Sequence, residues 1–392
     1  MRIAIIPSSD LSYNSGSVIY AKNLFTFLHA QGHKAYLLGS KMPLDLDSDL
    51  LPYVKINAGL LEHPVIDDRT VSSVDYGKSL SGIINYLLEL HEEVGLDIIH
   101  AHYGSFNSFG AYVVSGLTKI PYVVSSFGRD INLGYEHDHR IKWLIDQSFL
   151  DASRILVTDQ QIKARISLMF PNASIIDKIN EIPMPLDSRI FEEGTVAFKE
   201  DLPILATINS CFSPEKGIST ILDAFSILIK KIPCRLLIAG QDDHPQQVHR
   251  QSLENKVKRL GIQDAVTFLG YLDRNNVGYL LKKSTLLIDA RLKGNFSSVL
   301  LEAMFMNTPV ITTRNEGSIK IIEHGYNGLL FEPNDASELE ANLMKCLQSS
   351  NTIIEFKNNM NSWVQRNGSL YREENGLMKV LEAFQEVLRE EI

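Results

Sequence analysis

The sequence predicts an α/β protein made of two doubly wound domains. Short apolar runs rich in isoleucine, leucine and valine, which are typical of buried parallel strands, alternate with amphipathic segments of helical period. One polar stretch, 186–203, interrupts this alternation, which then resumes to near the end of the chain. The length of 392 residues exceeds what one ordinary core accommodates, so two domains are expected.

The first half opens with a strand–helix–strand pattern. RIAIIP (2–7) has the composition of a buried strand, and apolar residues at helical spacing follow until Gly32 closes the helix. KAYLLG (34–39) is the next strand, and two strands joined through a helix are expected to be parallel. The remaining elements predicted in this half are helices over 80–95, 108–119 and 140–153 and strands over 97–102, 121–128 and 154–159.

The second half repeats the same alternation. Its predicted strands are 203–210, 234–240, 265–270, 285–290, 309–313 and 327–332, and its predicted helices are 217–232, 246–261, 276–284, 297–307, 318–325 and 337–348. The predicted domains are therefore 1–190 and 203–371. The amphipathic helix predicted over 372–392 could pack on either domain, and its return to the N-terminal one is one arrangement. Ligands of doubly wound sheets bind at the carboxyl ends of the strands, so a cleft between facing domains is the expected active site.

Composition excludes several classes of function. The net charge of −9 argues against a nucleic-acid partner. Three cysteines in no CxxC pattern favour a reducing compartment and argue against a metal cluster. The N-terminal run lacks the length and cleavage pattern of a signal peptide, and no apolar stretch approaches about 20 residues. A cytoplasmic protein is expected, with contact at a membrane surface left open.

Two segments of the second half have features of phosphate sites. In FSPEKG (212–217), Lys216 stands at the start of a helix, where free N–H groups and the helix dipole favour an anion. In GNFSSVLLEAM (294–304), Ser297 and Ser298 suit a helix N-terminus, and Glu302 follows about one turn later. A carboxylate there can accept the vicinal hydroxyls of a ribose. The alternatives are a solvated lysine and a surface glutamate.

Other polar motifs carry weaker signals. Gly16, in the loop after the first strand, could let the backbone approach phosphate or sugar, or it could simply form a turn. His100 and His102 have the spacing of a zinc pair, but no further ligand follows at suitable spacing. A structural or substrate-facing role is therefore expected for His102, and no metal site is predicted.

The ordered motifs PEKG, LLIAG, VTFLGYL, SSVLLEAM, PVITT and GYNGLLFEPND resemble the C-terminal half of retaining glycosyltransferases of the GT-B fold. The segments GSVIYAKNLFTFLHAQGHKAYLL, IIHAHYGSFNSFGAYVV and IPYVVSSFGRDI resemble the N-terminal half of the same family. This resemblance implies two Rossmann-like domains facing a central cleft. It also implies a nucleotide sugar, such as a UDP- or GDP-sugar, as the donor, and a carbohydrate, lipid-linked or protein acceptor.

The resemblance assigns roles to individual residues. It implies that Lys216 contacts the donor diphosphate and that Glu302 holds the nucleotide ribose. It places the turn from Phe296 through Ser297 and Ser298 to Val299 at the phosphates, and the strand end at Gly270 and Tyr271 beside the base. Lys216 and Asp130 are expected in the catalytic set, and His102 and Phe127 are expected on the acceptor side.

Three positions depart from the family pattern. The first acid of the Glu-x7-Glu motif, which would contact the donor sugar, is replaced by Gly294. The arginine three residues before the PEKG proline is replaced by Cys211, and the histidine before Gly128 is replaced by Phe127. The hypothesis is that Arg291 or Arg129 supplies the missing positive charge to the donor.

Three functions remain open at this point. The first is a metal-independent, retaining transfer of sugar to an acceptor hydroxyl, in glycan, glycolipid or glycoconjugate synthesis, without a cofactor. The second is a GT-B protein impaired in turnover that serves as a partner subunit or as a nucleotide-sugar-binding module. The third is a GT-B epimerase acting on UDP-N-acetylhexosamine, which requires several acid and base residues in the cleft.

Overall fold

The computed structural model describes residues 1–8, 11, 16–43, 46–57, 73–128, 130–171, 175–199, 201–242, 247–292 and 297–390. The chain forms two compact units. The first unit comprises Met1–Pro185 and Glu373–Ile392, and the second comprises Leu186–Arg372. The polar segment 186–203 therefore belongs by its contacts to the second unit.

Within the described residues, the first unit contains a parallel sheet of seven strands in the order β3-β2-β1-β4-β5-β6-β7. Its strands are β1 (Arg2–Ile6), β2 (Lys34–Gly39), β3 (Val54–Ile56), β4 (Ile98–His102), β5 (Tyr122–Ser126), β6 (Arg154–Val157) and β7 (Ile179–Glu181). Its helices are α1 (Gly16–Ala30), α2 (Ser73–Val94), α3 (Phe106–Thr118), α4 (Tyr135–His137), α5 (His139–Asp151), α6 (Gln160–Met169) and α13 (Glu373–Glu390).

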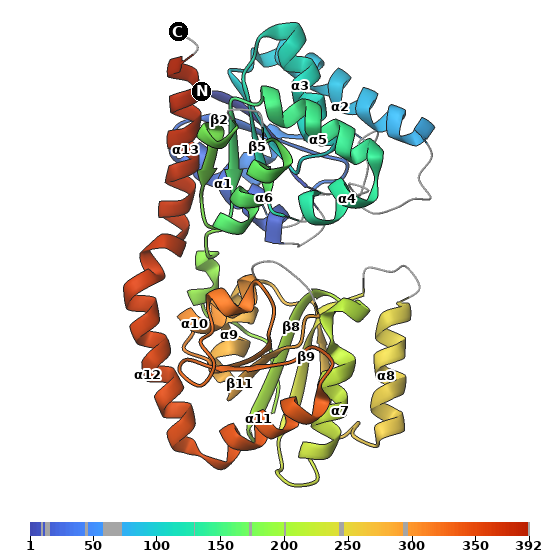
Figure 1. The fold of residues 1–392 in the computed structure, drawn as a ribbon, viewed down its shortest axis with the longest axis vertical. Coiled ribbons are helices and arrows are strands. Elements are labelled where there is room, and N and C mark those ends of the chain that lie inside the picture. Colours follow the sequence, from blue (N-terminus) through green and yellow to red (C-terminus); the bar gives the residue numbers. More distant parts are fainter. Residues whose placement is uncertain are drawn as a thin grey trace. The chain divides into compact units, whose positions relative to one another are not determined.

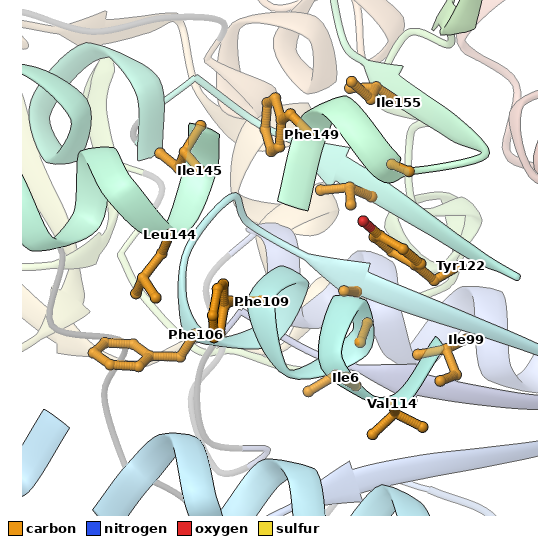
Figure 2. Packing of buried hydrophobic residues seen from close by; sticks show 14 of the residues in the cluster. Ile6, Ile99, Phe106, Phe109, Val114, Tyr122, Leu144, Ile145, Phe149 and Ile155 are labelled. Atoms are coloured by element: carbon orange, nitrogen blue, oxygen red, sulfur yellow. The ribbon is translucent and has the colours of Figure 1, made fainter. Parts of the chain in front are cut away.

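Helices cover both faces of this sheet because successive strand residues point to opposite sides. In β1, Ala4 and Ile6 join a core with α2, α3 and α5, whereas Ile3 and Ile5 join a core with α1 and α13. Figure 2 shows part of the first core, with side chains from the strands and from α3 and α5: Ile6, Ile99, Phe106, Phe109, Val114, Tyr122, Leu144, Ile145, Phe149 and Ile155. Burial on both faces explains why the strands are continuous apolar runs.

Helix α13 completes the second of these cores. Leu377, Val380, Leu381, Phe384 and Val387 are buried beside β1 and α1 residues, and α13 runs along the first unit (Figure 1). Its apolar stripe at helical spacing therefore packs on the N-terminal part of the chain.

The second unit contains, in the part of the chain that is described, a parallel sheet in the order β10-β9-β8-β11-β12-β13. Its strands are β8 (Ile204–Cys211), β9 (Arg235–Gln241), β10 (Val266–Gly270), β11 (Leu286–Asp289), β12 (Val310–Thr313) and β13 (Leu329–Phe331). Its helices are α7 (Ile218–Leu228), α8 (Val248–Leu260), α9 (Arg274–Lys283), α10 (Ser298–Phe305), α11 (Ala336–Gln348) and α12 (Ser350–Asn367). Figure 1 shows α7 and α8 side by side.

One predicted helix of this unit is wrong. Residues 318–325 contain only a 3-10 turn, η6 (Ser318–Lys320). The Ser318 hydroxyl donates to the Thr313 carbonyl oxygen (2.5 Å), and the Asn327 side chain donates to the Ile321 carbonyl oxygen (2.9 Å). Such side-chain hydrogen bonds offer the backbone an alternative to the helical ladder, and they close a loop here.

No helix in the described part of the chain is both long enough and apolar enough to cross a membrane.

Candidate functional site

The candidate site of the second unit lies where the strand order of its sheet reverses. The chain runs outward from β8 to β9 and β10, and then returns to β11 on the other side of β8. The carboxyl ends of β8 and β11 are therefore neighbours at a topological switch point, which is where ligands of such sheets bind. The segment after β8 carries Lys216, and the segment after β11 carries Arg291 and leads into α10.

The PEKG turn packs directly on the end of β11. Residues Pro214–Lys216 form a 3-10 turn, η5, and Gly217 follows with φ of 63°. A Cβ atom at Gly217 would lie 1.9 Å from the Ala290 carbonyl oxygen, so only glycine permits this approach. The Leu292 N–H donates to the Glu215 carbonyl oxygen at 2.9 Å. These contacts fix Lys216 beside the segment that carries Arg291.

Lys216 and Arg291 influence each other electrostatically. Burial lowers the pKa of the half-buried Lys216 amine, and the positive charge of Arg291 lowers it further. Asp289 and Glu215 oppose this shift in the pKa. The structure thus brings the predicted Lys216 near Arg291, which is one of the two arginines, with Arg129, expected to replace the missing cation.

Arg291 is held at its backbone and has spare donors on its side chain. Its carbonyl oxygen accepts from the Thr313 hydroxyl (2.5 Å), while Nη2 lies 3.7 Å from Asp289 Oδ2. The buried Nε has no hydrogen-bond partner among the described atoms. A buried guanidinium N–H without an acceptor suits an anionic ligand.

Ser297 precedes α10 without capping it through its side chain. Its hydroxyl donates instead to Asp289 Oδ2 at 3.0 Å, and both residues are buried. The side chain of this serine therefore does not cap α10, while its carbonyl oxygen accepts from the Leu300 N–H at 3.2 Å. Ser298 is exposed and Val299 is buried, so the helix start presents backbone and hydroxyl groups.

Glu302 is buried, with 3% of the residue exposed, and it forms an ion pair. Arg274 Nη2 lies 2.6 Å from Glu302 Oε1, and Arg274 Nε lies 3.6 Å from Asp187 Oδ2. The arginine comes from the start of α9, and the aspartate comes from the segment that leads into the second unit. Neither residue was predicted from the sequence, because an arginine at a helix start and an aspartate in a polar segment are ordinary surface patterns.

The end of β10 has the features expected of a base-binding edge. Gly270 adopts φ of 75°, and Tyr271 is 42% exposed. Two residues before Gly270, Phe268 packs edge-on against Phe212, and its ring centroid lies 5.5 Å from the Arg250 guanidinium carbon. An exposed aromatic ring beside a glycine offers a surface on which a planar ring can stack.

In the first unit, His102 ends β4 and is fully buried. Its ring stacks on Tyr20 and packs edge-on against Phe127. Burial lowers the pKa of His102 to about 3, so the imidazole is neutral at physiological pH. The structure therefore brings together the two residues predicted for the acceptor side. Gly16 begins α1, where a Cβ atom would make only an ordinary contact with Met184 (3.8 Å).

Asp130 has the contacts of a residue that organises loops. Its fully buried carboxylate accepts from the Gly104 N–H (2.7 Å), the Ser126 hydroxyl (3.0 Å) and the Gly128 N–H (3.1 Å). Burial raises the pKa of Asp130, and these hydrogen bonds oppose that shift. The carboxylate joins the segments after β4 and β5, and its predicted catalytic role stays a prediction.

Three predicted donor residues, Arg129, Gly294 and Phe296, lie outside the described residues. Among the residues that are described, no three His, Cys, Asp or Glu side chains gather in a way that could hold a metal ion.

Part of the chain matches the model of a known protein family. Residues 190–363 match the family model described as glycosyl transferases group 1. Over 334 residues the chain is 28% identical to the N-acetyl-alpha-D-glucosaminyl L-malate synthase of Bacillus anthracis, and the match covers 82% of each chain.

Two solved structures resemble the whole chain. Sucrose-phosphate synthase from Thermosynechococcus elongatus has a TM-score of 0.79 at 20% identity and covers 99% of both chains. Anabaena HepE in complex with UDP-glucose has a TM-score of 0.74 at 16% identity, covering 98% of this chain and 100% of its own. At these identities the likeness identifies the fold, and the predicted pair of Rossmann-like domains of the GT-B type is confirmed.

Proposed function

Since residues 190–363 belong to the glycosyl transferases group 1 family, we propose that the chain moves a sugar from a nucleotide-diphosphate sugar to an acceptor hydroxyl with retention of configuration. The observation that carries this proposal is the convergence of Lys216 and Arg291 at the switch point of the second sheet. A diphosphate carries negative charge that two neighbouring cations can bind through charge-assisted hydrogen bonds. The solved Anabaena relative carries UDP-glucose, which supports a nucleotide sugar as donor.

In the proposed mechanism, the second unit stabilises the leaving group. Negative charge grows on the departing diphosphate, and Lys216, Arg291 and the N–H groups at the start of α10 meet it with fixed positive charge. Glu302 accepts from the ribose hydroxyls and does not act as an acid or base. Arg291 replaces the charge of the arginine that is absent at Cys211, and Lys216 supplies the second charge, so we propose that transfer needs no metal ion.

The bond changes can proceed without a nucleophile from the protein. The acceptor oxygen attacks the anomeric carbon from the face that the diphosphate leaves, and the departing phosphate oxygen takes the hydroxyl proton. The resemblance to retaining enzymes is the basis for this route. It also explains how transfer could proceed with Gly294 in place of the acid. The loss of that acid then alters which donor sugar the site accepts. The cytoplasmic location and a carbohydrate, lipid-linked or protein acceptor remain part of the proposal.

A second function is favoured by the three departures from the family pattern at Cys211, Phe127 and Gly294. In that case the chain binds a nucleotide sugar and does not turn it over, and it serves as a partner subunit or binding module.

Nucleotide release and calorimetry separate the two functions. The intact protein is incubated with UDP- and GDP-sugars and a panel of acceptors, with and without EDTA, and nucleotide release is measured beside the binding of UDP and GDP. We expect acceptor-dependent release that persists in EDTA, with the anomeric configuration retained by NMR. Binding without release across the whole panel would instead establish the second function, and release of UDP from UDP-N-acetylhexosamine without acceptor would indicate an epimerase.

A further inference from the structure

Glu302 belongs to a chain of four alternating charges, of which three are largely buried and the fourth, Arg189, has a side chain that is 36% exposed. Arg189 donates to Asp187 through Nε (3.0 Å) and Nη2 (2.7 Å), Asp187 faces Arg274, and Arg274 pairs with Glu302 at 2.6 Å. The side chains of Asp187, Arg274 and Glu302 are 5%, 15% and 4% exposed. Glu302 therefore meets its ligand as one end of a chain of ion pairs.

The position of Arg274 is set by backbone contacts. Asp273 caps α9 by accepting from the Asn276 N–H, and Asn276 Oδ1 accepts from the N–H groups of Thr195 and Val196, both at 2.7 Å. A Cβ atom at Gly278 would lie 1.8 Å from the Ile190 carbonyl oxygen, so α9 touches the segment after Asp187 directly. These contacts hold Arg274 beside Glu302 without help from a ligand.

The electrostatics of this row of ion pairs keep its two middle groups, Asp187 and Arg274, charged. Burial lowers the pKa of the Arg274 guanidinium, but attraction to Glu302 and Asp187 outweighs burial and the pKa is raised overall. Burial raises the pKa of Asp187, yet its contacts with Arg189 and Arg274 hold the pKa below its usual value. A carboxylate buried beside a permanent cation stays ionised and keeps its orientation.

We propose that Arg274 is the positioning residue that makes Glu302 selective for ribose. Arg274 holds Oε1 and so turns the other oxygen of Glu302 toward the hydroxyls of the sugar. This inference rests on the proposed function, in which Glu302 receives the ribose of the donor. In this proposal Arg274 contacts the carboxylates of Glu302 and Asp187 and no part of the nucleotide, so its effect falls on the recognition of the 2′-hydroxyl group.

The test compares ribonucleotides with their 2′-deoxy counterparts. Calorimetry measures UDP, 2′-deoxy-UDP, GDP and 2′-deoxy-GDP on the intact protein and on the variants Arg274→Gln, Arg274→Lys and Glu302→Gln. The wild type is expected to prefer the ribose form of its nucleotide by about tenfold, the value of one hydrogen bond to a charged group. In Arg274→Gln this preference should fall to about twofold or less, with the affinity for the 2′-deoxy form almost unchanged, and Arg274→Lys should restore part of it.

The matched control is Arg235→Gln, which breaks another arginine–carboxylate pair, with Asp201, at the amino end of β9. It should keep the full ribose preference. Where Arg274→Gln fails to fold, Arg274→Lys and Asp187→Asn carry the same measurement, and each should reduce the preference.

Two results would overturn the role of Arg274 and leave the proposed function standing. One is a wild-type ribose preference that Arg274→Gln and Arg274→Lys retain. The other is a rise in UDP or GDP affinity in Arg274→Gln, which would mean that Arg274 blocks Glu302 rather than orienting it. A wild type that binds no nucleotide overturns the proposed function and the role of Arg274 with it.

Discussion

Two cations placed close together repel each other. Lys216 is half-buried, and the positive charge of Arg291 nearby disfavours the charge of the lysine. Asp289, which the Ser297 hydroxyl holds at 3.0 Å, partly relieves this repulsion. In the proposed function a diphosphate would relieve the repulsion further, so we expect the site to favour a dianion over a neutral ligand.

Removing Arg291 should weaken nucleotide binding and change its dependence on pH. Arg291→Gln is expected to lower UDP or GDP affinity at pH 7 by about tenfold, because one charge-assisted contact is lost. The ligand binds the protonated lysine, so affinity falls as pH rises through the pKa of Lys216. Since Arg291 is one of the causes that lower this pKa, the variant should lose affinity at a higher pH than the wild type.

Calorimetric titrations between pH 7 and 10 would measure both effects, with Arg235→Gln as the control for loss of an arginine elsewhere in the unit. An unchanged affinity at pH 7, or a fall that begins at a lower pH than in the wild type, would contradict the role given to Arg291.

At the scale of elements, α9 supports the candidate site of the second unit. The helix carries Arg274 at its start and receives the segment 186–196 along its side through Asn276 and Gly278. A glycine inside a helix usually has a packing reason, and the reason at Gly278 is the Ile190 backbone. In the sequence this segment belongs to the polar stretch 186–203, which interrupts the alternation of predicted strands and helices.

The packing of α9 on this segment can be tested by adding one methyl group at Gly278. Gly278→Ala is expected to destabilise the second unit by about 3 kcal/mol, because the new Cβ atom must displace backbone and not a flexible side chain. The control is Gly116→Ala in α3, where nothing lies within 4 Å and alanine should stabilise by about 0.5–1 kcal/mol. Urea unfolding followed by circular dichroism measures both variants, and equal effects at the two positions would refute the packing argument.

The sequence predicts elements that are continuously apolar better than elements that are polar or only three residues long. Strands such as β1 and β11 are continuous apolar runs buried on both faces, and their pattern leaves little choice. The three-residue strands β3 and β7 and the largely polar helix α12 offer too few apolar residues to be recognised. The predicted helix over 318–325 is wrong because Ser318 and Asn327 bind the backbone instead.

The candidate site was predictable only in part, for a related reason. Lys216 and Glu302 stand in motifs with local signals, whereas Arg274 and Asp187 are far apart in the sequence and meet only through the packing of α9. Ion pairs of this kind depend on tertiary contacts, and no local pattern contains them.

At the scale of the whole molecule, the two units should differ in their response to acid. His100 and His102 are both fully buried in the first unit, and burial keeps the pKa of each below the ordinary value of 6.5, to about 3 for His102. Below pH 6.5 the unfolded chain therefore takes up protons that the folded unit does not. The free energy of unfolding of this unit decreases as the pH decreases in that range.

Replacing His102 should flatten this dependence. In the wild type, His102 alone is expected to lower the free energy of unfolding by about 2 kcal/mol as the pH falls from 7 to 5. His102→Phe, which keeps an aromatic ring beside Tyr20 and Phe127, should lack that loss, whereas His139→Gln at an exposed position should follow the wild type. Urea unfolding at pH 7, 6 and 5 measures the slopes, and identical slopes for His102→Phe and wild type would exclude a buried neutral imidazole.

The place of α13 in the first unit also has a consequence for the order of events on the ribosome. Translation delivers the seven strands of the first sheet early, but the helix that covers Ile3, Ile5 and the apolar side of α1 is made after the entire second unit. The nascent first unit therefore waits with an uncovered apolar face while the second can already close its own cores. The molecule completes its two halves in the reverse of the order in which it begins them.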